Sequence, residues 1–85
     1  MKWYFPKYKD IPTDKTERWL QVLKVISETN ETRQALSDET DQRVIEEALD
    51  VIHAAETLLR SYPEDMVDKE HAKVITKNQN RGYYS

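Results

Sequence analysis

Hydrophobic residues recur at helical spacing in three segments of this 85-residue chain, and prolines and a single glycine separate these segments. The clearest segment covers residues 39–61. At 100° per residue, its apolar side chains fall within about 80° of Val44, with polar side chains opposite. The apolar positions are Ala48, Val51, Ile52, Ala55, Leu58 and Leu59, and the opposite positions are Glu46, Asp50, His53 and Thr57. The pattern predicts an amphipathic helix that Tyr62-Pro63 terminates.

Two further segments predict helices with less regular apolar faces. Residues 14–36 begin at a cap formed by Thr13 or Asp14, and Glu17 follows Asp14 at the spacing of a capping box. The first half of this helix is apolar almost all the way round, so we expect it to be buried on two sides. Residues 64–79 form a third helix with a weaker pattern, which ends before the glycine.

The rest of the chain completes an all-α prediction with one domain, residues 1–85. Residues 1–12 are rich in aromatic side chains and predict an extended arm with at most one short strand. Hydrophobic residues are 38% of the chain and charged residues 34%, which is little material for a core of this size. We therefore expect an antiparallel helical hairpin plus a third helix that completes its core as a homodimer or homotetramer. For the arm, packing on a neighbouring subunit is favoured over stacking on a nucleobase.

Charge and composition exclude several classes of function. The net charge of −3 argues against nucleic acid and anionic membranes as partners. The absence of cysteine removes disulfides and thiol catalysis, and one glycine is too few for a glycine-rich phosphate loop. No apolar run reaches the ~20 residues that span a membrane. The sequence therefore predicts a soluble, cytoplasmic protein.

Two pairs of carboxylates are candidates for the chemistry. Glu28 and Glu31 stand one turn apart on the first predicted helix, and Glu47 and Asp50 repeat this spacing on the second. Fifteen residues separate the pairs, so antiparallel packing would bring the four carboxylates together. Acids beside a core require compensation, either by Lys and Arg or by a hard divalent cation such as Mg²⁺ or Mn²⁺. With 16 acidic residues in the chain, chance pairing on a solvated face is the competing interpretation.

The same residues resemble a known family. Residues 28–31 (ETNE), followed after 15 residues by 47–50 (EALD), are similar to the ExxE…ExxD signature of the MazG-like all-α nucleoside triphosphate pyrophosphohydrolases. Residues 46–60 resemble the second core helix of the small phage and Gram-positive members. Residues 77–84 resemble their Lys-Asn…Arg-Gly-Tyr tail.

The resemblance implies a Mg²⁺-dependent enzyme, with Mn²⁺ as a substitute, that hydrolyses the α–β phosphate bond of an NTP or dNTP to the monophosphate and pyrophosphate. It implies metal-binding and catalytic roles for Glu28, Glu31, Glu47 and Asp50, and substrate contacts for Lys77, Asn78 and Arg81. Ser27 stands where many members carry an additional glutamate, so an inactive member with a degenerate metal site is one alternative. A non-catalytic helical interaction module is the other.

Overall fold

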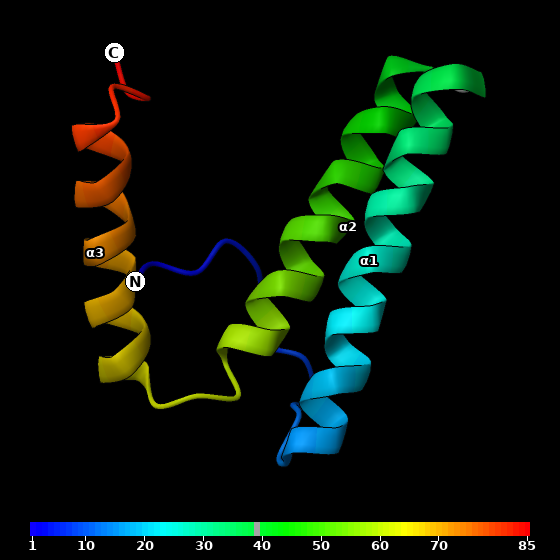
Figure 1. The fold of residues 1–85 in the computed structure, drawn as a ribbon. Helices are drawn as coiled ribbons and strands as arrows, with labels where there is room; N and C mark the ends of the chain where they lie inside the picture. Colours follow the sequence, from blue (N-terminus) through cyan, green and yellow to red (C-terminus); the bar gives the residue numbers. More distant parts are fainter. Residues whose placement is uncertain (39) are drawn as a thin grey trace.

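Three helices make up the computed structural model, which describes residues 1–38 and 40–85 (Figure 1). The helices are α1, Lys15–Asp38, α2, Asp41–Leu59, and α3, Glu64–Asn80. Each predicted boundary lies within two residues of the observed one, and no strand occurs in the described ranges. The prediction of an all-α fold is confirmed.

Side-chain hydrogen bonds cap the starts of the first two helices. The backbone N–H of Glu17 donates to Asp14 Oδ1 at 2.8 Å, and the backbone N–H of Thr13 donates to Glu17 Oε1 at 3.1 Å. Asp14 is therefore the cap that the spacing predicts, while the return bond of the capping box goes to Thr13, one residue before the cap. Thr40 caps α2 by accepting a hydrogen bond from a backbone N–H in the first turn. The predicted start of this helix at residue 39 lies outside the described residues.

The residues that follow α3 form a turn that terminates the helix. Gly82 has a φ of 73°, a left-handed conformation that glycine adopts without steric cost. Its N–H donates to the Gln79 carbonyl at 3.0 Å, and the N–H of Tyr83 donates to the Asn78 carbonyl at 3.1 Å. These two bonds form a Schellman motif, which terminates the helix.

The hairpin of α1 and α2 is antiparallel, as predicted, and the two helices lie side by side along their length (Figure 1). Polar contacts join them at intervals. Gln21 Nε2 donates to the Ala54 carbonyl at 2.9 Å. Near the start of α1, the Arg18 guanidinium donates to both Ser61 Oγ, at 3.0 Å, and the Ser61 carbonyl, at 2.6 Å. Because both partners in these pairs are partly buried, the contacts fix how the helices face each other.

The face of α2 that is buried differs from the prediction. The buried residues described are Ala35, Ala54, Val67, Glu28, Glu47, Glu56 and Thr57. Thr57 and the half-buried His53 had been predicted opposite the core, whereas Ile52 and Leu59 of the predicted apolar face are 40% and 36% exposed. The prediction was wrong because α2 turns the side that carries Glu47 and Ala54 toward α1, and this leaves part of its apolar stripe uncovered.

The N-terminal segment, residues 1–14, packs on α2 of its own chain. The Glu56 carboxylate accepts hydrogen bonds from the backbone N–H groups of Tyr4, at 2.7 Å, and Phe5, at 3.0 Å. Arg60 Nη2 donates to the Phe5 carbonyl at 2.7 Å, and its guanidinium lies 4.6 Å from the centre of the Trp3 ring. These contacts differ from the expectation that the aromatic residues of this segment pack on a neighbouring subunit.

The third helix stands apart from the hairpin (Figure 1). Among the described residues, extensive packing between helices is confined to α1 and α2. The radius of gyration is 14.7 Å, against about 12 Å for a compact domain of this length. Large apolar side chains on all three helices are exposed, among them Trp19, Ile45 and Met66. No helix in the described ranges is both long and apolar enough to cross a membrane.

Candidate metal centre

Three of the four predicted acids meet where α1 and α2 pack together. Glu28 from α1 and Glu47 and Asp50 from α2 each offer a carboxylate oxygen, and these oxygens lie within 4.8 Å of one another. Glu28 is 9% exposed and Glu47 is 3% exposed, while Asp50 faces solvent. Glutamates are rarely so buried unless they are paired or bind a metal. The antiparallel hairpin therefore gathers these acids as the spacing predicted.

The fourth acid, Glu31, lies at the solvent edge of the same cluster. Its pKa is raised above the ordinary value, chiefly by the negative charge of Glu28, with a further contribution from Glu47. The contributions of Glu28 and Glu47, by charge and by side-chain hydrogen bonds, arise because the three carboxylates are neighbours, and desolvation also raises this pKa. The cluster is therefore a concentration of negative charge that a cation would relieve.

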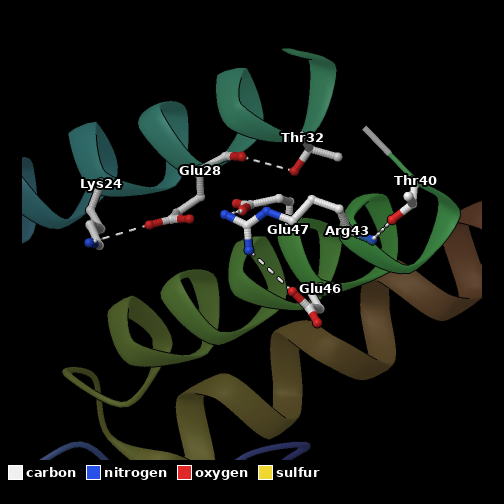
Figure 2. Close-up of polar contacts among 7 residues, drawn as sticks. All are labelled: Lys24, Glu28, Thr32, Thr40, Arg43, Glu46 and Glu47. Atoms are coloured by element: carbon white, nitrogen blue, oxygen red, sulfur yellow. Dashed lines mark hydrogen bonds and ion pairs between the residues drawn. The ribbon is translucent and has the colours of Figure 1, made fainter. Parts of the chain in front are cut away.

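Two cationic side chains compensate part of this charge (Figure 2). Lys24 Nζ lies 3.3 Å from Glu28 Oε1. Arg43 places Nη2 2.5 Å from Glu47 Oε1 and Nη1 3.1 Å from Oε2 of the exposed Glu46. The other oxygen of Glu47, Oε2, is buried and has no hydrogen-bond partner among the described residues. A buried carboxylate oxygen without a partner is energetically costly, and a cation or a proton at this atom would remove that cost.

The donor set fits a hard divalent cation. The cluster contains carboxylates from three residues in the described ranges, with neither histidine nor cysteine among them. Oxygen ligands of this kind favour Mg²⁺ or Mn²⁺ over Zn²⁺. Glu47 Oε2 supplies an observation independent of the clustering, because either a bound cation or a proton would account for its burial without a partner.

A groove of about 680 Å³ opens beside the cluster, and Glu28 and Asp50 form part of its wall. This volume is within the range of small-molecule sites, about 300–1,000 Å³. The N-terminal segment, α1 and α2 all contribute to it. Its further lining residues include Tyr8, Lys9, Gln21, Lys24, His53 and Thr57. The groove therefore combines carboxylates, lysines and an aromatic surface.

The predicted substrate residues lie elsewhere in the protomer. Lys77 and Arg81 line a separate, shallow surface groove on α3. The Asn78 amide nitrogen donates to the Tyr84 hydroxyl at 3.4 Å. None of these three predicted residues lines the groove beside the acids in the described structure. A role for them at the cluster of the same protomer therefore finds no support in this geometry, and a second subunit would have to bring them there.

Sequence reasoning missed the aromatic wall of the groove. The His53 imidazole, predicted to be solvated, is stacked between Phe5, at 4.5 Å between ring centroids and 14° between planes, and Tyr8, at 4.3 Å and 9°. One signal was available, since His53 follows Asp50 by three residues and so shares its side of α2. The position of the N-terminal segment had no comparable signal.

Comparison of the chain with known protein families, curated proteins and solved structures found no match. The likeness to the MazG-like enzymes therefore rests on the two acidic motifs and their flanks. Residues 28–31 and 47–50 carry that likeness.

Proposed function

We propose that this protein is a divalent-cation-dependent pyrophosphohydrolase of nucleoside triphosphates. The observation that carries the proposal is Glu47, whose buried Oε2 lacks a partner in the described structure and whose carboxylate lies beside those of Glu28 and Asp50. The groove beside this cluster supports it, since it has the volume for a nucleotide. The resemblance of residues 28–31 and 47–50 to the family signature supports the same reaction.

In the proposed reaction, Glu28, Glu31, Glu47 and Asp50 hold Mg²⁺, or Mn²⁺ in its place. The bound ion supplies neutralisation of phosphate charge and a lower pKa for a coordinated water. Water oxygen forms a bond to the α phosphorus, and the bond from that phosphorus to the oxygen bridging to the β phosphate breaks. Pyrophosphate leaves and the nucleoside monophosphate remains. A carboxylate of the cluster that is not fully engaged by the ion takes the proton of the water.

Positive charge for the phosphates has two proposed sources. Lys9 and Lys24 line the groove in the same protomer. Lys77 lies on α3 and Arg81 directly follows it. Because α3 packs little on the hairpin, α3 of a second copy is the proposed route by which these side chains reach the phosphates. Arginine and lysine suit this role because they form charge-assisted hydrogen bonds with phosphate oxygens.

The primary test is a product assay with Mg²⁺ or Mn²⁺ and a panel of canonical and modified NTPs and dNTPs. We expect pyrophosphate and monophosphate in equal amounts, with activity lost in EDTA. Orthophosphate and a diphosphate as products would contradict the proposed bond. Binding of Mn²⁺ without turnover of any nucleotide would favour the alternative of an inactive family member, in which Ser27 replaces the additional glutamate. A protein that neither binds metal nor turns over nucleotide would fit the helical interaction module.

We expect the protein to be a homodimer or homotetramer in solution. The chain exposes 6797 Å² of surface, roughly 1,500 Å² more than a compact protein of its mass. A stable interface removes about 800 Å² from each partner. Light scattering should therefore report a mass at least twice the 10.1 kDa of the chain, and a monodisperse monomer would contradict the expectation. Trp19→Glu, at a 64% exposed tryptophan, should weaken assembly, whereas Thr16→Glu on the same helix should not.

A further inference from the structure

Three rings form one continuous stack at the rim of the groove. His53 lies between Phe5 and Tyr8, with planes tilted by 14° and 9° and centroids 4.5 and 4.3 Å away. The stack is anchored at one end, because the backbone of Phe5 is hydrogen-bonded to both Glu56 and Arg60. The orientation of the Tyr8 ring is therefore set by contacts with α2 and is present before any ligand arrives.

The outer face of Tyr8 is exposed. His53 covers one face of the ring, yet the residue as a whole is 49% exposed, so the exposure belongs mainly to the opposite face and the edge. Tyr8 also lines the groove that Glu28 and Asp50 border. The groove thus presents a flat aromatic surface together with two carboxylates of the proposed metal centre, those of Glu28 and Asp50.

A ligand that binds both the aromatic surface and the carboxylates of this groove carries a flat aromatic ring and a cation-bound phosphate chain. Aromatic side chains bind nucleobases by stacking, and this works for every base because each has a π face. We propose that the outer face of Tyr8 is the stacking platform for the nucleobase, with the rings of His53 and Phe5 behind it. This inference rests on the proposed function, since it assigns the base end of the same substrate.

Tyr8→Ala tests the platform through the dependence of turnover on the base. We expect the KM for an NTP to rise roughly tenfold, which corresponds to the loss of one base–aromatic stack. The inhibition constant of inorganic triphosphate, which has no base, should stay unchanged. Tyr8→Phe should keep the wild-type KM. Tyr4→Ala is the matched control, because Tyr4 is a 74% exposed aromatic of the same segment that does not line the groove.

Two kinetic outcomes would overturn the inference. An unchanged KM in Tyr8→Ala would show that the ring does not bind the base. An equal loss of NTP and inorganic triphosphate binding would show that Tyr8 acts only by supporting the fold of the groove. Circular dichroism and Mn²⁺ affinity of Tyr8→Ala, compared with those of Tyr4→Ala, report whether the helices and the acidic cluster are intact.

A direct binding measurement separates this inference from the proposed function. In Tyr8→Trp with Trp3 and Trp19 changed to Phe, the new indole is the sole tryptophan, because the chain has two. A nucleotide with an uncleavable α–β linkage and Mn²⁺ should quench its fluorescence, and inorganic triphosphate should not. Quenching in a protein that hydrolyses no nucleotide would support base stacking on Tyr8 and contradict the proposed hydrolase activity. Turnover without quenching, together with an unchanged KM in Tyr8→Ala, would support the hydrolase activity and contradict base stacking on Tyr8.

Discussion

Glu47→Gln is expected to reduce pyrophosphate release by about 10²-fold to 10³-fold or more, the scale on which a single preorganised electrostatic group contributes to catalysis. The amide has nearly the same shape as the carboxylate but is a much weaker ligand for a hard cation. Glu47 is 3% exposed, and its Oε2 is one of two buried side-chain atoms without a partner in the described structure. Mn²⁺ affinity should fall together with the rate.

Glu46→Gln is the matched control for this variant. Glu46 is adjacent to Glu47 in the chain and contacts the same Arg43, at 3.1 Å, but it is exposed and lies outside the acidic cluster. We expect near wild-type turnover and metal affinity from it. Helix content measured by circular dichroism should be unchanged in both variants. A Glu47→Gln protein that retains most of its activity would reject the assigned site, and an equal loss in Glu46→Gln would show that the effect passes through Arg43.

Glu56→Ala is expected to give the largest loss of stability. Its carboxylate is buried and accepts two backbone hydrogen bonds, from Tyr4 at 2.7 Å and Phe5 at 3.0 Å. Removing an acceptor of this kind costs about 2–3 kcal/mol, because hydrogen bonds to a charged group are strong and the donors lose their partner. For a domain of this size, that is a fall in Tm of roughly 10 °C or more.

The same variant should release the N-terminal segment from α2. In a Trp19→Phe background, Trp3 is the sole tryptophan, and its ring lies against Arg60 in the wild-type structure. Its emission should shift to the red in Glu56→Ala as the ring enters water. The control is Glu46→Ala, which removes an exposed acid of the same helix. It should lower the free energy of unfolding by no more than a surface ion pair contributes, about 1 kcal/mol. A Glu56→Ala protein with unchanged Tm and unchanged emission would contradict the proposed attachment.

Agreement between sequence and structure is best where the determinants are local. The cap at Asp14, with Glu17 three residues on, and the left-handed Gly82 act within one helical turn, so the residue types themselves indicate where α1 starts and α3 ends. The pairing of Glu28 with Glu47 required one further step, antiparallel packing, which a short connection between the helices favours.

Sequence and structure agree least on which face of α2 is buried. The apolar stripe of α2 includes Ile52 and Leu59, and hydrophobic burial within a monomer favours placing both against α1. The structure places Glu47, Ala54 and Thr57 in buried positions instead. A sequence pattern records which residues share a side of a helix, but it does not record whether the partner is another helix of the chain or a second subunit. An exposed apolar stripe is what the proposed oligomer would cover.

By itself, the sequence determined the three helices, their ends and the spacing of the four acids, because hydrogen bonds and side-chain periodicity within a helix depend on residues a few positions apart. Only the tertiary structure decided that Glu47 is buried without a partner for Oε2 and that Tyr8 stacks on His53 beside the acids. These features arise from contacts between residues more than 15 positions apart. Such contacts depend on how α1, α2 and the N-terminal segment pack as whole elements, which is set by the sum of many weak interactions and not by any one spacing in the chain.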